Sequence, residues 1–379
     1  MFMRKTAMLM LLAVSLLLSG SLAFANGQKE SQAAAAPAAS TSSTAQLLAS
    51  TVHPPTFDDS KLFGLRDALS QAMQGKDMSK VNTWMVVNIL ATYWVAGKEG
   101  DAQAARELGI KAQYEGPTQG QLSTQVSMYQ TLASTGANGL FTSVIDPTSE
   151  ARILNNAVDK GVNLVAIDSP VPASVHSLVY VGTPNYAAGQ AAGEAMKKAL
   201  PQGGDVAILT GSLTAPNALQ RIAGFKAALA GSNVQVATTQ NDNGSAATAS
   251  SNADSVIASM PNLKGMYGVY SYDGPAAAVA VKSKGEIGKI MVVADDNEPG
   301  TIAGLKNGTV AASIIQQPYM QGYLGAYITA AMEVLGKQAV TKILQPFETD
   351  GVISTGVGTL TQANLAADES YNTEISTGG

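Results

Sequence analysis

The sequence predicts an α/β protein with two Rossmann-like lobes, each built on a parallel sheet. From Thr83 onward, apolar runs of strand length alternate with Ala-rich segments of helical spacing. The runs are apolar throughout, which is typical of strands covered by helices on both faces. About ten such runs fall within roughly 260 residues, more than one sheet holds comfortably, so two lobes are the natural division.

Each expected element follows from its own stretch of sequence. The strands are expected at 84–90, 139–145, 162–167, 178–181, 206–209, 234–238, 266–270, 290–294 and 310–315, with a weaker candidate at 110–114. The helices are expected at 61–73, 121–134, 150–160, 186–200, 217–229, 246–260, 275–284 and 321–335. Glycines at 109, 136, 161, 285 and 336 follow helical segments, where C-terminal caps belong. Gly189 and Gly193 lie inside a helix and indicate close packing rather than a phosphate loop.

The chain also repeats one pattern. Residues 162–168 and 290–296 are both apolar strands that end in aspartate, at Asp168 and Asp296, with a proline shortly after each. In open α/β sheets, ligands bind outside the carboxyl ends of the strands. Two lobes with aspartates at these ends therefore predict a ligand cleft between the lobes.

Composition excludes many activities. The 379 residues include no cysteine and only two histidines, so thiolate metal sites, disulfides and a Cys nucleophile are excluded. No dinucleotide, P-loop or G-x-S-x-G motif is present, and no cofactor, metal or enzyme activity is expected. Charged residues make up 13%, and the net charge of −5 makes the chain a poor nucleic-acid binder.

The N-terminus reads as an export signal. Residues 1–25 combine the basic pair Arg4 and Lys5, an apolar run and a small-x-small cleavage site, which predicts a signal peptide and a periplasmic location. Ser21 stands where a lipoprotein would carry its lipidated cysteine, so no such anchor is expected. Residues 26–55 are rich in Ala and Ser and are expected to be a disordered linker.

Carboxylates, amides and aromatic rings follow the expected strands. This chemistry suits a neutral polyhydroxylated ligand, because carboxylates accept hydroxyl donors and aromatic faces cover the C–H faces of a sugar. The candidate ligand-binding residues are Tyr93, Trp94, Asp146, Asp168, Arg221, Tyr272, Asp296 and Gln316.

Each candidate also has a structural alternative. Asp146 and Asp168 could cap turns before proline, and Asp273 beside Gly274 could be an ordinary turn. Tyr93 and Trp94 could belong to a lobe core, and Arg221 could be a solvated surface charge.

Several short motifs, in order, resemble the periplasmic sugar-binding proteins of the ribose/galactose type, the type I solute-binding proteins of ABC importers. The resemblance covers roughly 83–344. The stretch from Thr92 to Gly100 is similar to the family's N-P-F-F segment, Asp146-Pro147-Thr148 to its N-P-T/D, and Ile167-Asp168 to its hydrophobic-Asp-Arg. Further matches are R-x-x-G-F at 221–225, F-D-x-x-P at 295–299 and Q-x-P-x-x-x-G at 316–322.

The resemblance implies a ligand site, a hinge and partners. In the family, positions matching Tyr93 and Trp94 stack on the sugar, and those matching Asp168, Arg221, Asp296 and Gln316 contact it. Three crossings are expected near 181–183, 316–318 and 342–345, which divides the chain into an N-terminal lobe (81–182 plus 317–341) and a C-terminal lobe (183–316 plus 342–365). The implied protein is a monomer that closes on a sugar or polyol and serves an ABC permease. A sugar sensor for a chemoreceptor or histidine kinase is the alternative.

Three positions depart from the family pattern. Ser169 replaces the arginine that follows the strand-end aspartate, Asp146 replaces asparagine, and Tyr272 stands where asparagine is common. The pocket is therefore expected to be more acidic than that of a ribose receptor. A hexose, polyol, inositol or amino-sugar stays open as the ligand.

Overall fold

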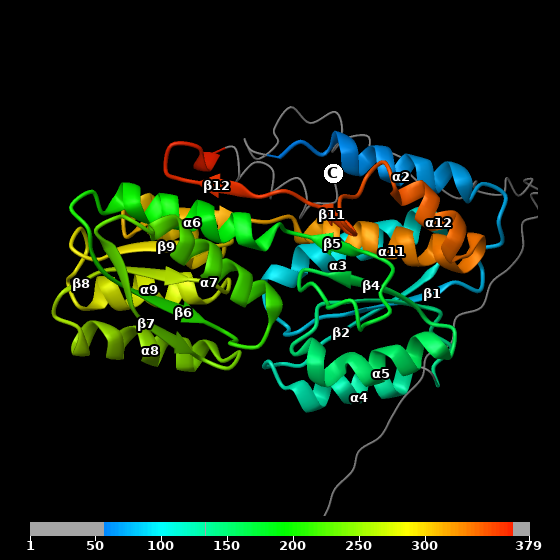
Figure 1. Ribbon diagram of the computed structural model, residues 1–379, viewed down its shortest axis with the longest axis horizontal. Helices are drawn as coiled ribbons and strands as arrows, with labels where there is room; N and C mark the ends of the chain where they lie inside the picture. The colour runs from blue at the N-terminus through cyan, green and yellow to red at the C-terminus, as the bar shows by residue number, and fades with distance from the viewer. Residues whose placement is uncertain (1–56, 133, 367–379) are drawn as a thin grey trace, which may run out of the picture. The chain divides into compact units, whose positions relative to one another are not determined.

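The computed structural model describes residues 57–132 and 134–366 and arranges them as two α/β lobes (Figure 1). Each lobe contains a six-stranded sheet with helices on both faces, which confirms the predicted fold class. The expected signal peptide at 1–25 and the expected linker at 26–55 both lie outside the described residues.

The sheet of the N-terminal lobe has the strand order β11-β5-β4-β3-β1-β2, and all its neighbours pair in parallel. Its strands are β1 (Asn82–Val86), β2 (Lys111–Glu115), β3 (Gly139–Thr142), β4 (Asn163–Ile167), β5 (Tyr180–Gly182) and β11 (Val352–Ser354). On one face, α3 (Tyr93–Leu108) and α11 (Pro318–Leu335) form a core together with α2 (Ser60–Ala72) and α12 (Lys337–Leu344). The other face is covered by α4 (Leu122–Leu132) and α5 (Pro147–Asp159).

The sheet of the C-terminal lobe has the order β12-β10-β9-β8-β6-β7, parallel except for the pairing of β12 with β10. Its strands are β6 (Gly204–Thr210), β7 (Val234–Asn241), β8 (Leu263–Gly268), β9 (Met291–Asp295), β10 (Val310–Ile315) and β12 (Gly358–Leu360). One face packs against α6 (Asn185–Ala199) and α7 (Pro216–Leu229). The other packs against α8 (Ala246–Ser259), α9 (Asp273–Ser283) and α10 (Pro299–Asn307).

The third crossing between the lobes differs from the expectation. It was expected near 342–345, but α12 buries Val340 and Leu344 in the core of the N-terminal lobe, and β11 then pairs with β5. The chain enters the other sheet only between Ser354 and Gly358, so residues 337–354 belong to the N-terminal lobe. The physical reason is that the apolar side of α12 is covered by α2 and α11.

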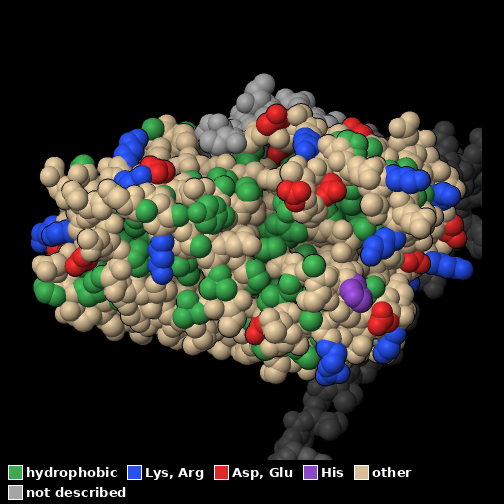
Figure 2. All heavy atoms as spheres, in the orientation of Figure 1, with side chains coloured by type: hydrophobic (Ala, Val, Ile, Leu, Met, Phe, Trp, Pro, Cys, Tyr) green, Lys and Arg blue, Asp and Glu red, His purple; other side chains and the backbone are tan. Residues whose placement is uncertain are grey.

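In the part of the chain that the structure describes, none of the helices has the length and apolar character needed to cross a membrane. On the face drawn in Figure 2, lysines and arginines lie mostly toward the two ends, and apolar side chains are scattered between them.

Glycines bring pairs of helices into backbone contact. A Cβ on Gly189 of α6 would lie 2.0 Å from the carbonyl oxygen of Arg221 in α7, and one on Gly224 would lie 2.0 Å from the carbonyl oxygen of Tyr186. The expectation that Gly189 serves packing is therefore confirmed. Because the contact is with the backbone of Arg221, it also fixes where that side chain starts.

We expect Gly189→Ala to destabilise the C-terminal lobe, because the added methyl group meets backbone atoms that cannot move independently. The cost should be about 1–3 kcal/mol, typical of overpacking, despite the better helix propensity of alanine. Thermal denaturation of Gly189→Ala should show a lowered Tm, whereas Gln190→Ala, at the exposed neighbouring position, should melt like the parent protein. Equal melting temperatures would contradict this account of α6 and α7.

Candidate functional site

A cavity of about 40 Å³ lies where the carboxyl ends of strands from both sheets meet. Seven of the eight predicted ligand-binding residues line it: Tyr93, Trp94, Asp168, Arg221, Tyr272, Asp296 and Gln316. Sequence reasoning missed several further lining residues, namely Asn88, Asn217, Tyr270 and Ser271. Asn217 precedes Arg221 by four residues on α7, so helical spacing alone would have placed both on one face.

Arg221 is the buried cation of this site. Its side chain forms a 3.0 Å ion pair with Asp295 and lies 3.9 Å from the carboxylate of Asp168. The guanidinium also donates to Asn185 Oδ1 at 2.9 Å and to Gln316 Oε1. Burial alone would lower the pKa of Arg221, but the neighbouring aspartates outweigh it and raise the pKa. The alternative of a solvated surface arginine is therefore wrong, since only 3% of the residue is exposed.

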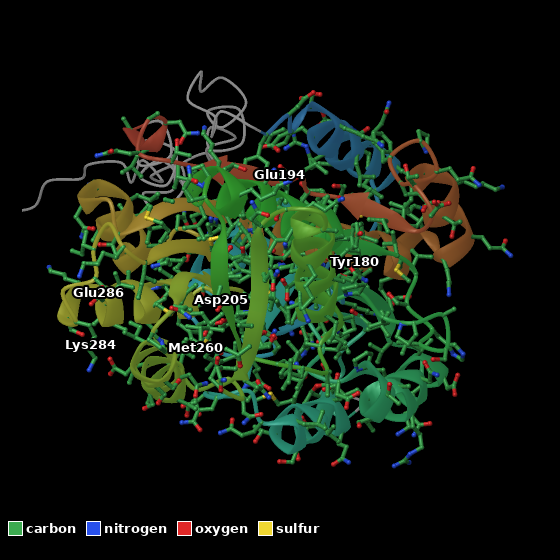
Figure 3. All side chains as sticks on the ribbon, turned by 60° about the vertical axis from the view of Figure 1, so that its left-hand side comes forward. Tyr180, Glu194, Asp205, Met260, Lys284 and Glu286 are labelled. Atoms are coloured by element: carbon green, nitrogen blue, oxygen red, sulfur yellow. The ribbon has the colours of Figure 1, made fainter. Side chains whose placement is uncertain are left out.

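Asp168 follows β4 and faces the C-terminal lobe. Its carboxylate accepts the hydroxyl of Ser143 at 2.7 Å and the side-chain amide of Asn217 at 3.0 Å. Its main chain is held by Tyr180 of β5, labelled in Figure 3, whose hydroxyl lies 2.7 Å from the carbonyl oxygen of Asp168. Burial raises the pKa of Asp168, and this effect exceeds the opposing effect of Arg221.

Asp296 occupies the equivalent place in the other lobe. It follows β9, and its carboxylate accepts the amide of Gln316 at 2.8 Å. Burial is the main cause that raises the pKa of Asp296 to about 8, and the adjacent Asp295 adds to it. Burial likewise raises the pKa of Asp295 to about 7, against the attraction of Arg221.

Both strand-end aspartates have left-handed backbone conformations. The φ angle is 56° at Asp168 and 66° at Asp296, a region that non-glycine residues rarely adopt. Such strain costs of order 1–3 kcal/mol and clusters at functional sites. The sequence repeat is therefore also a repeat in backbone geometry. Each lobe contributes one aspartate with a strained backbone whose side chain lines the cavity.

Tyr93 and Trp94 have different surroundings, one mainly in the cavity wall and the other in the core of the lobe. Trp94 is only 1% exposed, packs in the core of the N-terminal lobe and donates its indole N–H to Asn88 Oδ1 at 3.1 Å. Tyr93 packs edge-to-face on Trp94, with ring centroids 4.8 Å apart, and its hydroxyl reaches Gln321 at 3.2 Å. Both line the cavity, but Tyr93 keeps the larger exposed share.

Asp146 does not join the other seven residues. Its carboxylate caps α5 and accepts the backbone N–H groups of Thr148 and Ser149 at 3.0 and 3.2 Å. It borders a neighbouring cavity of about 310 Å³ instead. The turn-capping alternative therefore describes Asp146, because an aspartate before proline satisfies the free N–H groups of the helix that follows.

Among the described residues, no group of three or more His, Asp or Glu side chains is placed to hold a metal ion. The site offers hydrogen-bond acceptors, one guanidinium and aromatic rings, which can bind a polar solute without changing its covalent bonds.

Fold and site together define a solute-binding protein of the type I periplasmic class, in which two α/β lobes enclose a polar cavity. The chain belongs to the periplasmic binding protein domain family, whose sequence pattern matches residues 84–338. It is accordingly a binding receptor and not an enzyme.

Two named relatives match nearly two thirds of this chain in sequence, and a solved structure shares its fold. A D-ribose/D-allose-binding protein of Pseudomonas aeruginosa is 28% identical over 244 residues, which are 63% of this chain and 74% of that protein. A xylose/arabinose-binding protein of Sulfolobus acidocaldarius is 28% identical over 264 residues, 64% of each chain. The crystal structure of an ABC transporter solute-binding protein from Burkholderia graminis, in complex with D-arabinose, has 31% identity and a TM-score of 0.70, covering 76% of this chain and 98% of that one.

Asp296→Asn should make the stability of the free protein less dependent on pH between about pH 4 and 8. Because the pKa of Asp296 is raised to about 8 in the folded chain, the folded state binds more protons than the unfolded state between about pH 4 and 8. Stability therefore falls as pH rises through this window, by at most about 1.4 kcal/mol per pH unit for this one group.

Thermal melts from pH 5 to 9 check this expectation. Asp296→Asn and the parent protein should melt alike at pH 5, and the variant should melt at a higher temperature at pH 9. Parallel curves over the whole range would show that Asp296 does not carry this raised pKa.

Proposed function

We propose that this chain is an exported receptor that binds a sugar or sugar-like polyol between its lobes and delivers it to an ABC permease. The observation that carries the proposal is the pair of strained aspartates, one from each lobe, that face Arg221 across a cavity walled by Tyr93. Carboxylates accept sugar hydroxyls, the guanidinium donates to sugar oxygens, and the ring covers apolar C–H groups. The relatives described above bind ribose, allose, xylose or arabinose, which supports a ligand of this size.

Ligand entry requires an exchange of hydrogen bonds. The cavity has room for only about three water molecules, because Arg221 bonds Gln316 and Asn217 bonds Asp168 across it. We propose that sugar hydroxyls replace these partners, so that each protein group keeps a hydrogen bond when the ligand is bound. Hinge closure then follows from the ligand's contacts with both lobes.

Location and partner follow from the same proposal. The signal peptide predicted at 1–25 would carry the chain to the periplasm, where receptors of this family are found. A single chain contains both lobes of the site, so we propose that the receptor works as a monomer and presents its closed form to the permease.

A thermal-shift panel tests ligand binding. Pentoses, hexoses, inositols and amino-sugars, including ribose, allose, xylose and arabinose, would be added to the protein one at a time. A ligand at 100 times its Kd should add about 2.7 kcal/mol of stability and raise the Tm by several degrees. A folded protein whose Tm responds to no member of the panel would overturn the sugar assignment.

Asp168→Asn should weaken binding of any sugar found in this way by about tenfold to a hundredfold, because a charge-assisted hydrogen bond is lost. The amide retains the shape of the carboxylate and tolerates the left-handed backbone of Asp168. Asp146→Asn, the same change at the end of the neighbouring strand, should leave affinity unaltered. Calorimetric titration gives both values, and equal effects of the two substitutions would contradict the assignment of Asp168.

Closure brings two glycine loops into contact. A Cβ on Gly244, in the loop after β7, would lie 2.7 Å from the backbone nitrogen of Gly120 in the N-terminal lobe. Glu298 makes a second link across the cleft, since its carboxylate accepts hydrogen bonds from Thr92 and from the backbone N–H of Tyr93. Both links join the two lobes in the described structure, so we propose that they form on closure.

Gly244→Ala should therefore hinder closure and weaken sugar binding by about tenfold or more. Gly231→Ala is the matched control, because its φ of 77° is close to the 75° of Gly244 and no atom lies within 4 Å of the added Cβ. Both substitutions should lower the Tm through backbone strain of about 1–2 kcal/mol. Only Gly244→Ala should reduce affinity; an equal reduction in both would remove this contact from the mechanism.

A further inference from the structure

Two buried carboxyl groups lie directly behind the ligand cavity. Asp242 follows β7 and Asp273 is the first residue of α9, and their exposed fractions are 1% and 0%. Neither residue lines the cavity. Tyr272 lines the cavity and connects it to these two carboxyl groups, because its hydroxyl bonds Asp242.

One oxygen of Asp242 organises both the cavity wall and the closing loop. Asp242 Oδ1 accepts the hydroxyl of Tyr272 at 2.9 Å. The same oxygen accepts the backbone N–H groups of Gly244 at 2.9 Å and Ser245 at 3.0 Å. Asp242 therefore ties a residue of the cavity wall to the glycine that meets Gly120 across the cleft.

The remaining oxygens of the pair need a proton. Asp273 Oδ2 accepts the backbone N–H of Tyr270 at 2.9 Å. Asp242 Oδ2 and Asp273 Oδ1 receive no donor from any other described residue, yet the two side chains lie within hydrogen-bonding reach of each other. Ionised carboxylates only accept, so the two side chains can be hydrogen-bonded to each other only if one carboxyl group is protonated.

The surroundings place this proton on Asp273. Burial raises the pKa of Asp242 as well, but the three donors to one of its oxygens oppose this effect and favour its ionised form. Asp273 has one donor, and complete burial together with the charge of Asp242 raises its pKa. Asp295 on β9 adds negative charge from a third element. Tyr270 and Tyr272 also lie next to Asp242 and Asp273, and burial together with these carboxylates raises the pKa values of both tyrosines. The positive charge of Arg221 opposes this rise at Tyr270.

We propose that Asp242 and Asp273 share one proton and act as positioning residues that hold Tyr272 in the cavity wall and loop 242–245 in its closing position. The proposal rests on the proposed function, since it concerns the same ligand cavity. Its consequence is that loss of the shared proton leaves two adjacent buried negative charges, which must move apart. Tyr272 and Gly244 are bonded to one of them and would move with it.

The pH dependence has a definite sign. The folded chain keeps a proton on the pair that the unfolded chain releases at ordinary carboxyl pKa values, so both the stability of the free protein and its sugar affinity should decline as pH rises into the alkaline range. Asp273→Asn should remove the share of this dependence that the pair contributes, because its amide can donate to Asp242 without a titrating proton and its carbonyl can still accept the N–H of Tyr270. Asp242→Ala removes the acceptor of three donors and should weaken binding by about tenfold or more.

The experiment compares three full-length variants with the parent protein from pH 6 to 10. The variants are Asp273→Asn, Asp242→Ala and Asp254→Asn, the last an exposed carboxylate of α8 lying 3.8 Å from Lys284 at the outer end of α9 (Figure 3). Thermal melts are recorded without ligand, and calorimetric titrations use D-arabinose, D-ribose and D-allose. The parent protein and Asp254→Asn should lose Tm and affinity together at high pH, and Asp273→Asn should lose less of each.

The possible outcomes test the sugar assignment and the shared proton separately. If no sugar of the thermal-shift panel binds the parent protein, the sugar assignment fails, while the melts alone still test the shared proton. If sugars bind and Asp273→Asn follows the parent profile in both measurements, the shared proton is overturned and the proposed function stands. If Asp242→Ala does not fold, the isosteric Asp273→Asn still gives the decisive comparison. If Asp273→Asn changes the pH dependence of the Tm but not that of the sugar affinity, the pair has only a structural role and does not position the ligand site.

Discussion

The candidate site depends on one buried ion pair, between Arg221 and Asp295. Both partners are almost fully buried, and removing one partner of such a pair typically costs 3–5 kcal/mol because the other charge is left uncompensated. Arg221 is held from behind by this pair and by Asn185, which leaves its remaining donors directed at Gln316 and toward Asp168. The glycine contact between α6 and α7 sets the backbone from which the side chain extends. The acidic character of the cavity is tolerated because this one cation faces carboxylates from both lobes.

Much of the fold and of the site could be predicted from the sequence, for a physical reason. Parallel strands buried on both faces are continuous apolar runs, and the residues that follow them meet at one edge of the sheet. Asp168 and Asp296 were found in this way, and so was the repeat that relates them. The local sequence does not show which hydrogen-bond partner a polar side chain will have in the folded protein. Asp146 and Asp168 both follow strands of the N-terminal lobe, yet one caps its own helix and the other faces the opposite lobe.

The same limit explains the other differences. The third crossing was placed too early because α12 could not be assigned to a lobe without knowing that α2 and α11 cover its apolar side. Asp273 beside Gly274 has the local sequence of an exposed turn. In the folded chain it is fully buried, and burial together with Asp242, which follows another strand, raises its pKa. Burial changes the pKa of a carboxyl group more than its sequence neighbours do, and the burial of Asp273 depends on elements that are distant in the sequence.

A receptor of this kind has to be stable without ligand and still bind it with a useful free energy. In this chain the candidate ligand-binding groups bond one another: Arg221 bonds Gln316, and Asn217 bonds Asp168. Replacing these bonds by bonds to sugar hydroxyls gains little by itself, because the number of hydrogen bonds changes little. Under the proposed function, a net gain must then come from a contact that the free protein lacks, namely burial of the sugar's C–H faces against the ring of Tyr93. Selectivity among sugars would accordingly depend on how many of the exchanged hydrogen bonds a given stereoisomer restores, since each buried group left without a partner costs about 1–3 kcal/mol.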